Sequence, residues 1–185
     1  MRLITDISEY HYSDIRPSDR VLDIGANCGA FSLAALKLCW HVTAIEPVTF
    51  KELFECTAQS GELGIGSGLR LYNCALGDGK IHTIHWDEHV ARVQTYPLDR
   101  LIEIAGGCDF LKCDAEGAEW TINPVHLKGI RRIEMELHCP PICALNPNSK
   151  PLTRYIRENY NCTVTDNSNR GVGVIGVLHA EVKKP

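Results

Sequence analysis

The chain has no apolar run long enough to cross a membrane, and its first residues lack the apolar core of a secretion signal. It also contains no internal repeat and no low-complexity tract. We therefore expect no membrane association and a cytoplasmic location. With 185 residues, of which 44% are hydrophobic and 23% charged, the chain can bury one good core. We expect a single domain over residues 1–185, with residues 1–19 as a lead-in segment before the first strand.

The chain also lacks an excess of positive charge. Its formal net charge is −4 at pH 7, whereas a nucleic-acid-binding domain usually shows a basic face. The pairs Arg131-Arg132 and Lys183-Lys184 are too small to form such a face. We therefore expect no nucleic-acid partner.

The nine cysteines include no C-x-x-C pair. Cys139 and Cys143, with His138 beside them, come closest to a metal-binding hairpin, but one pair without a second is weak evidence for zinc. Most of the cysteines lie in apolar segments, where a thiol behaves as a small hydrophobic group. We therefore expect reduced, unpaired thiols and no bound metal.

Short apolar runs alternate with helical patterns along the chain, which predicts a parallel sheet flanked by helices. Strands are expected at residues 20–24, 41–46, 69–76, 80–86, 109–113, 131–137, 162–166 and 172–179. Helices are expected at residues 31–40, 50–59, 98–105, 116–120 and 152–160. Loops are expected at residues 60–68, 87–94 and 139–151, the last being a candidate lid. Because a short turn joins the last two strands, we expect a Rossmann-like, doubly wound, mostly parallel sheet of about seven strands with an antiparallel C-terminal edge hairpin.

The most informative segment is VLDIGANCGAF at residues 21–31, which predicts a strand, a tight glycine turn and a helix start. Glycine lets backbone N–H groups approach a ligand closely. The spacing is D-x-G-x-x-x-G, not the G-x-G-x-x-G of dinucleotide-binding proteins. A carboxylate at Asp23 would repel a pyrophosphate but suits a ligand with a cationic amino group and sugar hydroxyls, such as S-adenosylmethionine. The alternative is a tight strand-to-helix connection in another kind of α/β protein.

The ends of the next two predicted strands are expected to face the same crevice. Glu46 follows Asp23 by 23 residues, at a position where an acid can accept hydrogen bonds from ribose hydroxyls. A solvated strand end is the alternative. At the third strand, Leu76 could flank a purine and Asp78 could accept a hydrogen bond from its exocyclic amine. A simple Gly-Asp-Gly turn explains Asp78 equally well.

Three acids, Asp114, Glu116 and Glu119, follow the strand predicted at residues 109–113. Asp114 is expected to point into the crevice beside the glycine loop. Glu116 and Glu119 are expected to share the face of a short helix, and ordinary acidic enrichment of a first helical turn is the alternative explanation for them.

Glu134, Glu136 and His138 alternate along the next strand and are expected to share one face. An exposed strand face is the alternative reading. His138 lies at the carboxyl end, where it could serve as a general base at neutral pH. A divalent ion held by Asp114, Glu116 and His138 is a less favoured alternative.

Taken together, these motifs resemble the FkbM-type S-adenosylmethionine-dependent methyltransferases. The resemblance covers roughly residues 20–140 and rests on the motifs VLDIGANxG at 21–29, IEP at 45–47, ALGD at 75–78, LD at 98–99, LKCDAEGAE at 111–119 and ELH at 136–138. The first motif is shared by many class I methyltransferases, whereas K-x-D-x-E-G-x-E is much more specific. The resemblance implies a seven-stranded Rossmann-like sheet and O-methylation, usually of a sugar or polyketide hydroxyl.

The resemblance also implies S-adenosyl-L-methionine as the cofactor and a small-molecule or carbohydrate acceptor, in a monomer or homodimer. The residues expected at the cofactor are Asp23, Gly25, Ala26, Asn27, Gly29, Phe31, Glu46, Pro47, Ala75, Leu76 and Asp78. Lys112, Asp114, Glu116 and His138 are expected around the reacting methyl group. Of these, Asp114 or His138 would be the base, and Glu116 and Lys112 would orient the acceptor.

Three other functions are consistent with parts of the sequence. A nicotinamide-dependent oxidoreductase is disfavoured because G-x-G-x-x-G is absent. A methyltransferase acting on nucleic-acid bases is disfavoured because the chain has no Asn/Asp-Pro-Pro-Tyr motif and is acidic. A non-catalytic S-adenosylmethionine-binding module or assembly partner remains an alternative, because the chain has no large insertion that could enclose a substrate.

Overall fold

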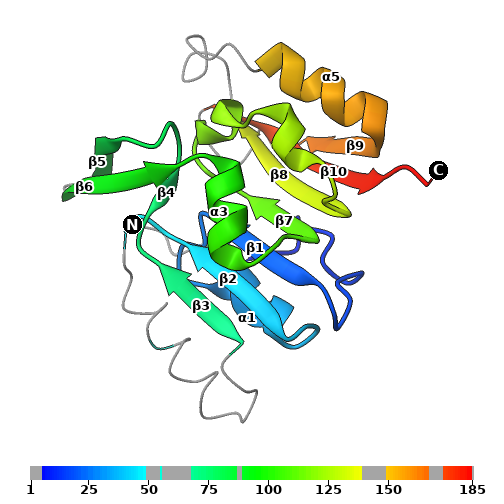
Figure 1. Cartoon of the computed structure of the whole chain (residues 1–185), viewed down its shortest axis with the longest axis horizontal. Coiled ribbons are helices and arrows are strands. Elements are labelled where there is room, and N and C mark those ends of the chain that lie inside the picture. Colours follow the sequence, from blue (N-terminus) through cyan, green and yellow to red (C-terminus); the bar gives the residue numbers. More distant parts are fainter. Residues whose placement is uncertain are drawn as a thin grey trace.

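A seven-stranded sheet forms the centre of the computed structural model, which describes residues 6–48, 55, 68–86, 89–138, 149–166 and 173–184 (Figure 1). The strands of this sheet are β1 (Arg20–Ile24), β2 (His41–Ile45), β3 (Leu69–Tyr72), β7 (Phe110–Cys113), β8 (Arg132–His138), β9 (Tyr160–Asp166) and β10 (Val174–Val182). Their order is β3-β2-β1-β7-β8-β10-β9. The first five strands in this order pair in parallel, and β10 runs antiparallel to both β8 and β9. The predicted mostly parallel sheet with an antiparallel C-terminal edge is therefore confirmed.

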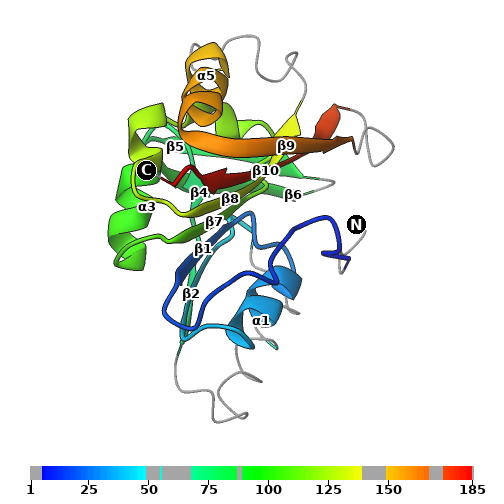
Figure 2. The same ribbon diagram turned by 90° about the vertical axis from the view of Figure 1, so that its right-hand side faces the viewer.

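Helices cover both faces of the sheet (Figure 2). On one face lie α1 (Ala30–Leu36) and the N-terminal segment, which share a core with Val21 and Phe110. The other face packs against α3 (Leu98–Ala105), the 3-10 helices η1 (Ala118–Thr121) and η2 (Pro124–Leu127), and α5 (Ser149–Asn159). Because side chains alternate along a strand, Val21 joins the first core and Leu22 the second. None of the helices in the described part of the chain is long and apolar enough to span a membrane.

A second, three-stranded sheet corrects two of the predictions. It consists of β4 (Ala75–Leu76), β6 (His89–Tyr96) and β5 (Ile81–Trp86), in the order β4-β6-β5. The predicted strand at residues 69–76 is split in two, and Asn73 at the break donates hydrogen bonds to the carbonyls of Glu46 and Pro47. The loop predicted at residues 87–94 is wrong, because residues 89–94 belong to β6 and pair with β5, and β6 buries Val93 and Thr95. In that stretch more buried and more exposed side chains alternate with a period of two, but many of its residues are polar, so the sequence does not show the strand.

The predicted helix at residues 116–120 is also wrong. Glu116 and Gly117 both adopt left-handed backbone conformations, with φ of 50° and 98°, which a right-handed helix cannot contain. Only η1 follows, so Glu116 and Glu119 do not share a helix face. Smaller differences concern α1, which ends at Leu36, and β9, which begins at Tyr160.

Several predictions lie outside the described residues. They are the helix at residues 50–59 apart from Glu55, most of the loop at 60–68, residues 139–148 of the candidate lid, and the pair Cys139 and Cys143. The last three residues of the predicted lid, 149–151, belong to α5, so the loop prediction is wrong for them.

The turn after β1 requires glycine at position 25. Gly25 has a φ of +74°, and a Cβ added there would lie 1.7 Å from the carbonyl oxygen of Asp114. The backbone N–H groups of Gly25 and Ala26 both donate to the carbonyl of Ile45, at 2.9 and 3.1 Å. The end of β7 therefore passes so close to the loop that any side chain would push the two apart.

We expect Gly25→Ala to destabilise the fold by about 2–4 kcal/mol, because backbone strain and overpacking add at this position. Gly106→Ala is the matched control, since Gly106 has nearly the same φ of +76° but no atom within 4 Å of an added Cβ. The control should cost only about 1–2 kcal/mol. Chemical denaturation measures both losses, and equal losses would show that contact with Asp114 is unimportant.

Candidate functional site

The carboxyl ends of β1, β2, β7 and β8 bring most of the predicted site residues together around the glycine loop, residues 25–29. A small cavity at this loop is lined by Asp6, Ile7, Glu9, Tyr10, Gly25, Ala26, Asn27, Ala30, Phe31, Lys112 and Asp114. Asn27 and Gly29 have φ of 50° and 84°, so the loop turns sharply before α1 begins. Six of the residues predicted at the site line this cavity: Gly25, Ala26, Asn27, Phe31, Lys112 and Asp114.

A buried ion pair between Asp23 and Lys112 lies next to the glycine loop. Asp23 is fully buried, and its Oδ2 accepts a hydrogen bond of 2.6 Å from the Ser32 hydroxyl. Lys112 Nζ lies 3.3 Å from Asp23 Oδ1 and donates a 2.7 Å hydrogen bond to the carbonyl of Gly25. Burial opposes a charge on Lys112, but Asp23 and Asp114 raise its pKa above the ordinary value. The cation beside Asp23 in this structure is therefore Lys112, and direct contact between Asp23 and a ligand stays a prediction.

Glu46 ties the end of β2 to the glycine loop. It is buried, and its two oxygens accept hydrogen bonds from the backbone N–H groups of Asn27 (2.8 Å) and Val48 (2.9 Å). Burial raises the pKa of Glu46 to about 7. The alternative of a solvated strand end is thus wrong, and the carboxylate stands where the loop begins its turn.

The end of the third predicted strand behaves differently. Leu76 is buried in the core beside α3, and Asp78 is partly exposed, 3.1 Å from Lys80 and 2.7 Å from His82. Hydrogen bonds from His82 and Lys80 lower the pKa of Asp78 below its ordinary range. The contacts that the structure describes for Asp78 stay within this turn and the strands β5 and β6. A role of Ala75, Leu76 and Asp78 at the cofactor stays a prediction.

The N-terminal segment contributes a residue that sequence reasoning missed. Tyr10 is buried, and its ring packs edge-on against Phe31 at 5.8 Å. The Tyr10 hydroxyl donates a 3.3 Å hydrogen bond to Asp114 Oδ2, and Lys112 Nζ lies 5.4 Å from the ring centroid. Burial raises the pKa of Tyr10 far above its ordinary value, so the hydroxyl stays a donor. No motif in residues 1–19 marks this tyrosine.

His138 lies among several carboxylates at the end of β8. Its Nε2 is 3.3 Å from Glu116 and 3.5 Å from Glu136, and its Nδ1 is 3.0 Å from Glu119. Although burial opposes the charge, hydrogen bonds to Glu116 and Glu119 raise the pKa of His138 to about 10. The ring therefore carries its proton at neutral pH, which argues against the hypothesis that His138 is a base there and favours Asp114.

The acids on β8 are buried, so the alternative of an exposed strand face is wrong for Glu134, Glu136 and His138. Burial first, and then the neighbouring Asp114, raise the pKa of Glu136 to about 8. At neutral pH Glu136 is therefore largely protonated, and it can donate a hydrogen bond to the Asp114 carboxylate.

Glu119 is the second residue that sequence reasoning missed. It is fully buried, and its oxygens accept hydrogen bonds of 2.8 Å from the backbone N–H groups of Gly117 and His138. The prediction attributed Glu119 to ordinary acidic enrichment of a helix. Its place in the K-x-D-x-E-G-x-E motif is the one signal that could have singled it out.

Two groups of side chains bring potential metal-ligating atoms within 4.8 Å of one another among the described residues: Asp114, Glu116 and His138, and His11, Glu134 and His179. A metal requires a neutral imidazole, whereas His138 holds its proton. In the second group, the oxygens of Glu134 accept hydrogen bonds from Arg132 at 2.8 Å and His179 at 2.6 Å. The side chains of both groups thus make close polar contacts with one another, and no metal is assigned to either.

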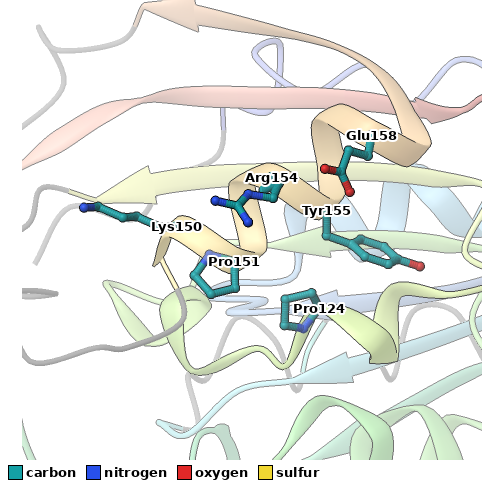
Figure 3. A pocket seen from close by; sticks show the side chains of 6 residues that line it. All are labelled: Pro124, Lys150, Pro151, Arg154, Tyr155 and Glu158. Carbon is teal, nitrogen blue, oxygen red and sulfur yellow. The ribbon is translucent and has the colours of Figure 1, made fainter.

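A larger cavity, of about 360 Å³, lies between η2 and α5 (Figure 3). It is lined by Pro124, Lys150, Pro151, Arg154, Tyr155 and Glu158. None of the predicted site residues lines it, and α5 packs on the face of the sheet opposite α1. The cavity is therefore separate from the glycine loop.

Comparisons with known proteins agree with this arrangement at the level of the fold. No family model and no curated protein matches the sequence. Among solved structures, the FkbM methyltransferase of Methylobacillus flagellatus superposes with a TM-score of 0.64 at 20% identity, over 94% of this chain and 47% of that one. An rRNA methylase of Streptococcus thermophilus gives 0.55 at 9% identity, over 91% and 90% of the two chains. A precorrin-6y C5,15-methyltransferase of Geobacter metallireducens gives 0.52 at 11% identity, over 91% and 83%.

The chain thus spans about half the length of the FkbM structure. The acceptors named for these proteins range from RNA to a precorrin. What the comparisons establish is that this chain has the Rossmann-like fold of the class I methyltransferases.

Proposed function

We propose that the chain binds S-adenosylmethionine at the glycine loop and catalyses methyl transfer to a hydroxyl of a sugar or another small acceptor. The observation that carries this proposal is the contact between Asp114 and the loop. The backbone of Asp114 touches Gly25, and its carboxylate meets Tyr10 and Lys112 at the same cavity. A candidate base therefore lies directly beside a candidate cofactor loop, in a chain with a methyltransferase fold.

The residues at the loop fit this cofactor. Glu46 offers a buried carboxylate at the strand end where ribose hydroxyls can be bound. The side-chain oxygen Asn27 Oδ1 is buried and accepts no hydrogen bond from the described residues, so a ligand that donates one would satisfy it. The acidic surroundings of Lys112 also suit a ligand with a cationic amino group better than a pyrophosphate.

The chemistry asked of the protein is orientation and proton removal. When bound, S-adenosylmethionine would supply the methyl group. Glu116, whose side chain is 83% exposed, is free to contact an acceptor, and Asp114 can take the proton that the acceptor hydroxyl loses. Orienting two reactants can contribute about 7–11 kcal/mol, and a base about 10²–10⁴-fold in rate.

Isothermal titration calorimetry should detect S-adenosylmethionine and S-adenosylhomocysteine binding at micromolar affinity. At 100 times the dissociation constant, either ligand should stabilise the fold by about 2.7 kcal/mol. NAD, tested as the control, should neither bind nor stabilise the fold. Folded protein that binds neither sulfur compound would refute the proposal, and binding without turnover over a broad acceptor panel would favour a non-catalytic module.

Glu46→Gln should weaken S-adenosylmethionine binding about 10–100-fold, because a charged hydrogen-bond acceptor is lost. The same change should alter the pH dependence of stability. Since the pKa of Glu46 is raised to about 7, its contribution to stability is present below the unfolded-state pKa and lost as the pH rises through 7. The variant should therefore gain stability relative to the parent between pH 5 and pH 8, by on the order of 3 kcal/mol.

Urea denaturation at several pH values and calorimetry together test this expectation. Glu103→Gln on α3 is the control, because that side chain is 68% exposed. If Glu46→Gln binds the cofactor as tightly as the parent, Glu46 is only a structural tie between β2 and the loop.

Asp114→Asn should leave much of the cofactor binding intact but reduce turnover about 10²–10⁴-fold, because an amide cannot take a proton. Asp99→Asn, at an exposed position on α3, should not change turnover. The measurement is the release of S-adenosylhomocysteine with the first acceptor found to react. Turnover close to that of the parent would mean that positioning alone drives the reaction.

A further inference from the structure

The turn between β7 and η1 sends two glutamates to the same histidine from opposite sides. The consecutive left-handed residues Glu116 and Gly117 reverse the chain. As a result the side chain of Glu116 is 83% exposed, whereas Glu119 has no exposed surface. A carboxylate buried so deeply is costly unless hydrogen bonds compensate it, so its partners are informative.

The partners of Glu119 converge on the last residue of β8. Glu119 Oε1 accepts from the backbone N–H of His138 (2.8 Å) and lies 3.0 Å from its ring Nδ1, while Oε2 accepts from the N–H of Gly117 (2.8 Å). Trp120 Nε1 donates to the carbonyl of His138 at 3.2 Å. The backbone of His138 is therefore held on both sides, and Glu119 also holds the ring.

The opposite ring nitrogen faces the candidate acceptor site. Nε2 lies 3.3 Å from Glu116 and 3.5 Å from Glu136, and Glu136 neighbours Asp114. With Nδ1–H donated to Glu119, the ring cannot turn without breaking that bond. A third group that orients a histidine in this way is a recurring device in enzyme sites.

We propose that Glu119 is a positioning residue, which fixes the ring of His138 so that Nε2–H points toward Glu116 and Glu136 beside Asp114. A role of Glu119 in catalysis depends on the proposed methyl transfer. The contact between Glu119 and the ring of His138 does not depend on it. A purely structural role, in which Glu119 only fastens η1 to β8, is the competing explanation.

The test is nuclear magnetic resonance of the whole chain labelled with ¹⁵N-histidine. In the parent, His138 should show a protected, hydrogen-bonded Nδ1–H and keep both ring protons through neutral pH. In Glu119→Gln, the proton affinity of the ring should fall at least tenfold and the protection of Nδ1–H should be lost. A folded variant with unchanged His138 signals would overturn the proposal.

Trp120→Phe is the matched control, because it removes the hydrogen bond to the backbone carbonyl of His138 and leaves the contact between Glu119 and the ring in place. It should lower the melting temperature and leave the ring signals of His138 as in the parent. If Glu119→Gln does not fold, the spectrum of the parent still tests the proposal. A His138 Nδ1 that carries no proton, or whose proton exchanges without protection, would refute the proposed role of Glu119.

Calorimetry separates this proposal from the proposed function. Parent protein that binds no S-adenosylmethionine but shows the expected His138 signals would refute the function and leave the positioning role intact. Once an acceptor is known, Glu119→Gln should lower kcat more than it raises KM, because it disturbs alignment more than binding.

Discussion

The buried ammonium of Lys112 is the interaction on which the candidate site depends. It lies between the carboxylates of Asp23 and Asp114 and donates to the carbonyl of Gly25. Without this cation, the fully buried carboxylate of Asp23 and the largely buried one of Asp114 would face each other unpaired, which is unfavourable. Lys112 thus connects the end of β1, the end of β7 and the glycine loop. Gly25 completes the arrangement, since only a residue without a side chain allows β7 to pass so close.

The parallel sheet explains why the remaining groups gather there. In parallel strands all carboxyl ends lie at one edge, so Glu46, Asp114 and His138 come together although they are far apart in the chain. The N-terminal segment then covers the same edge and places Tyr10 against Asp114 and Phe31. The site is thus assembled from four strand ends and one covering segment.

Charge divides this site into two parts. Around the glycine loop, Lys112 compensates the charges of Asp23 and Asp114. Beside it, His138 is surrounded by Glu116, Glu119 and Glu136. Burial opposes its charge, but hydrogen bonds to Glu116 and Glu119 raise the pKa of His138 to about 10. The histidine is therefore better suited to orient groups than to remove a proton, and Asp114, between the two parts, is the residue that we propose accepts one.

The sequence alone determined the fold class, the bounds of β1 and α3, and the residues of the glycine loop, because these depend on local periodicity and on the conformational freedom of glycine. It also predicted that Glu46, Lys112, Asp114 and His138 lie at one edge of the sheet, because they stand at or just beyond the carboxyl ends of strands whose order the fold prescribes. Only the tertiary structure decided that Lys112 neutralises Asp23, that Tyr10 bonds to Asp114, that Asp78 turns to Lys80 and His82, and that Glu119 holds His138. Most of these contacts join residues distant in the chain, and the left-handed turn at Glu116 and Gly117 has no periodic signature. Whether a buried polar side chain binds a ligand or a neighbour is decided by such partners, which local sequence does not specify.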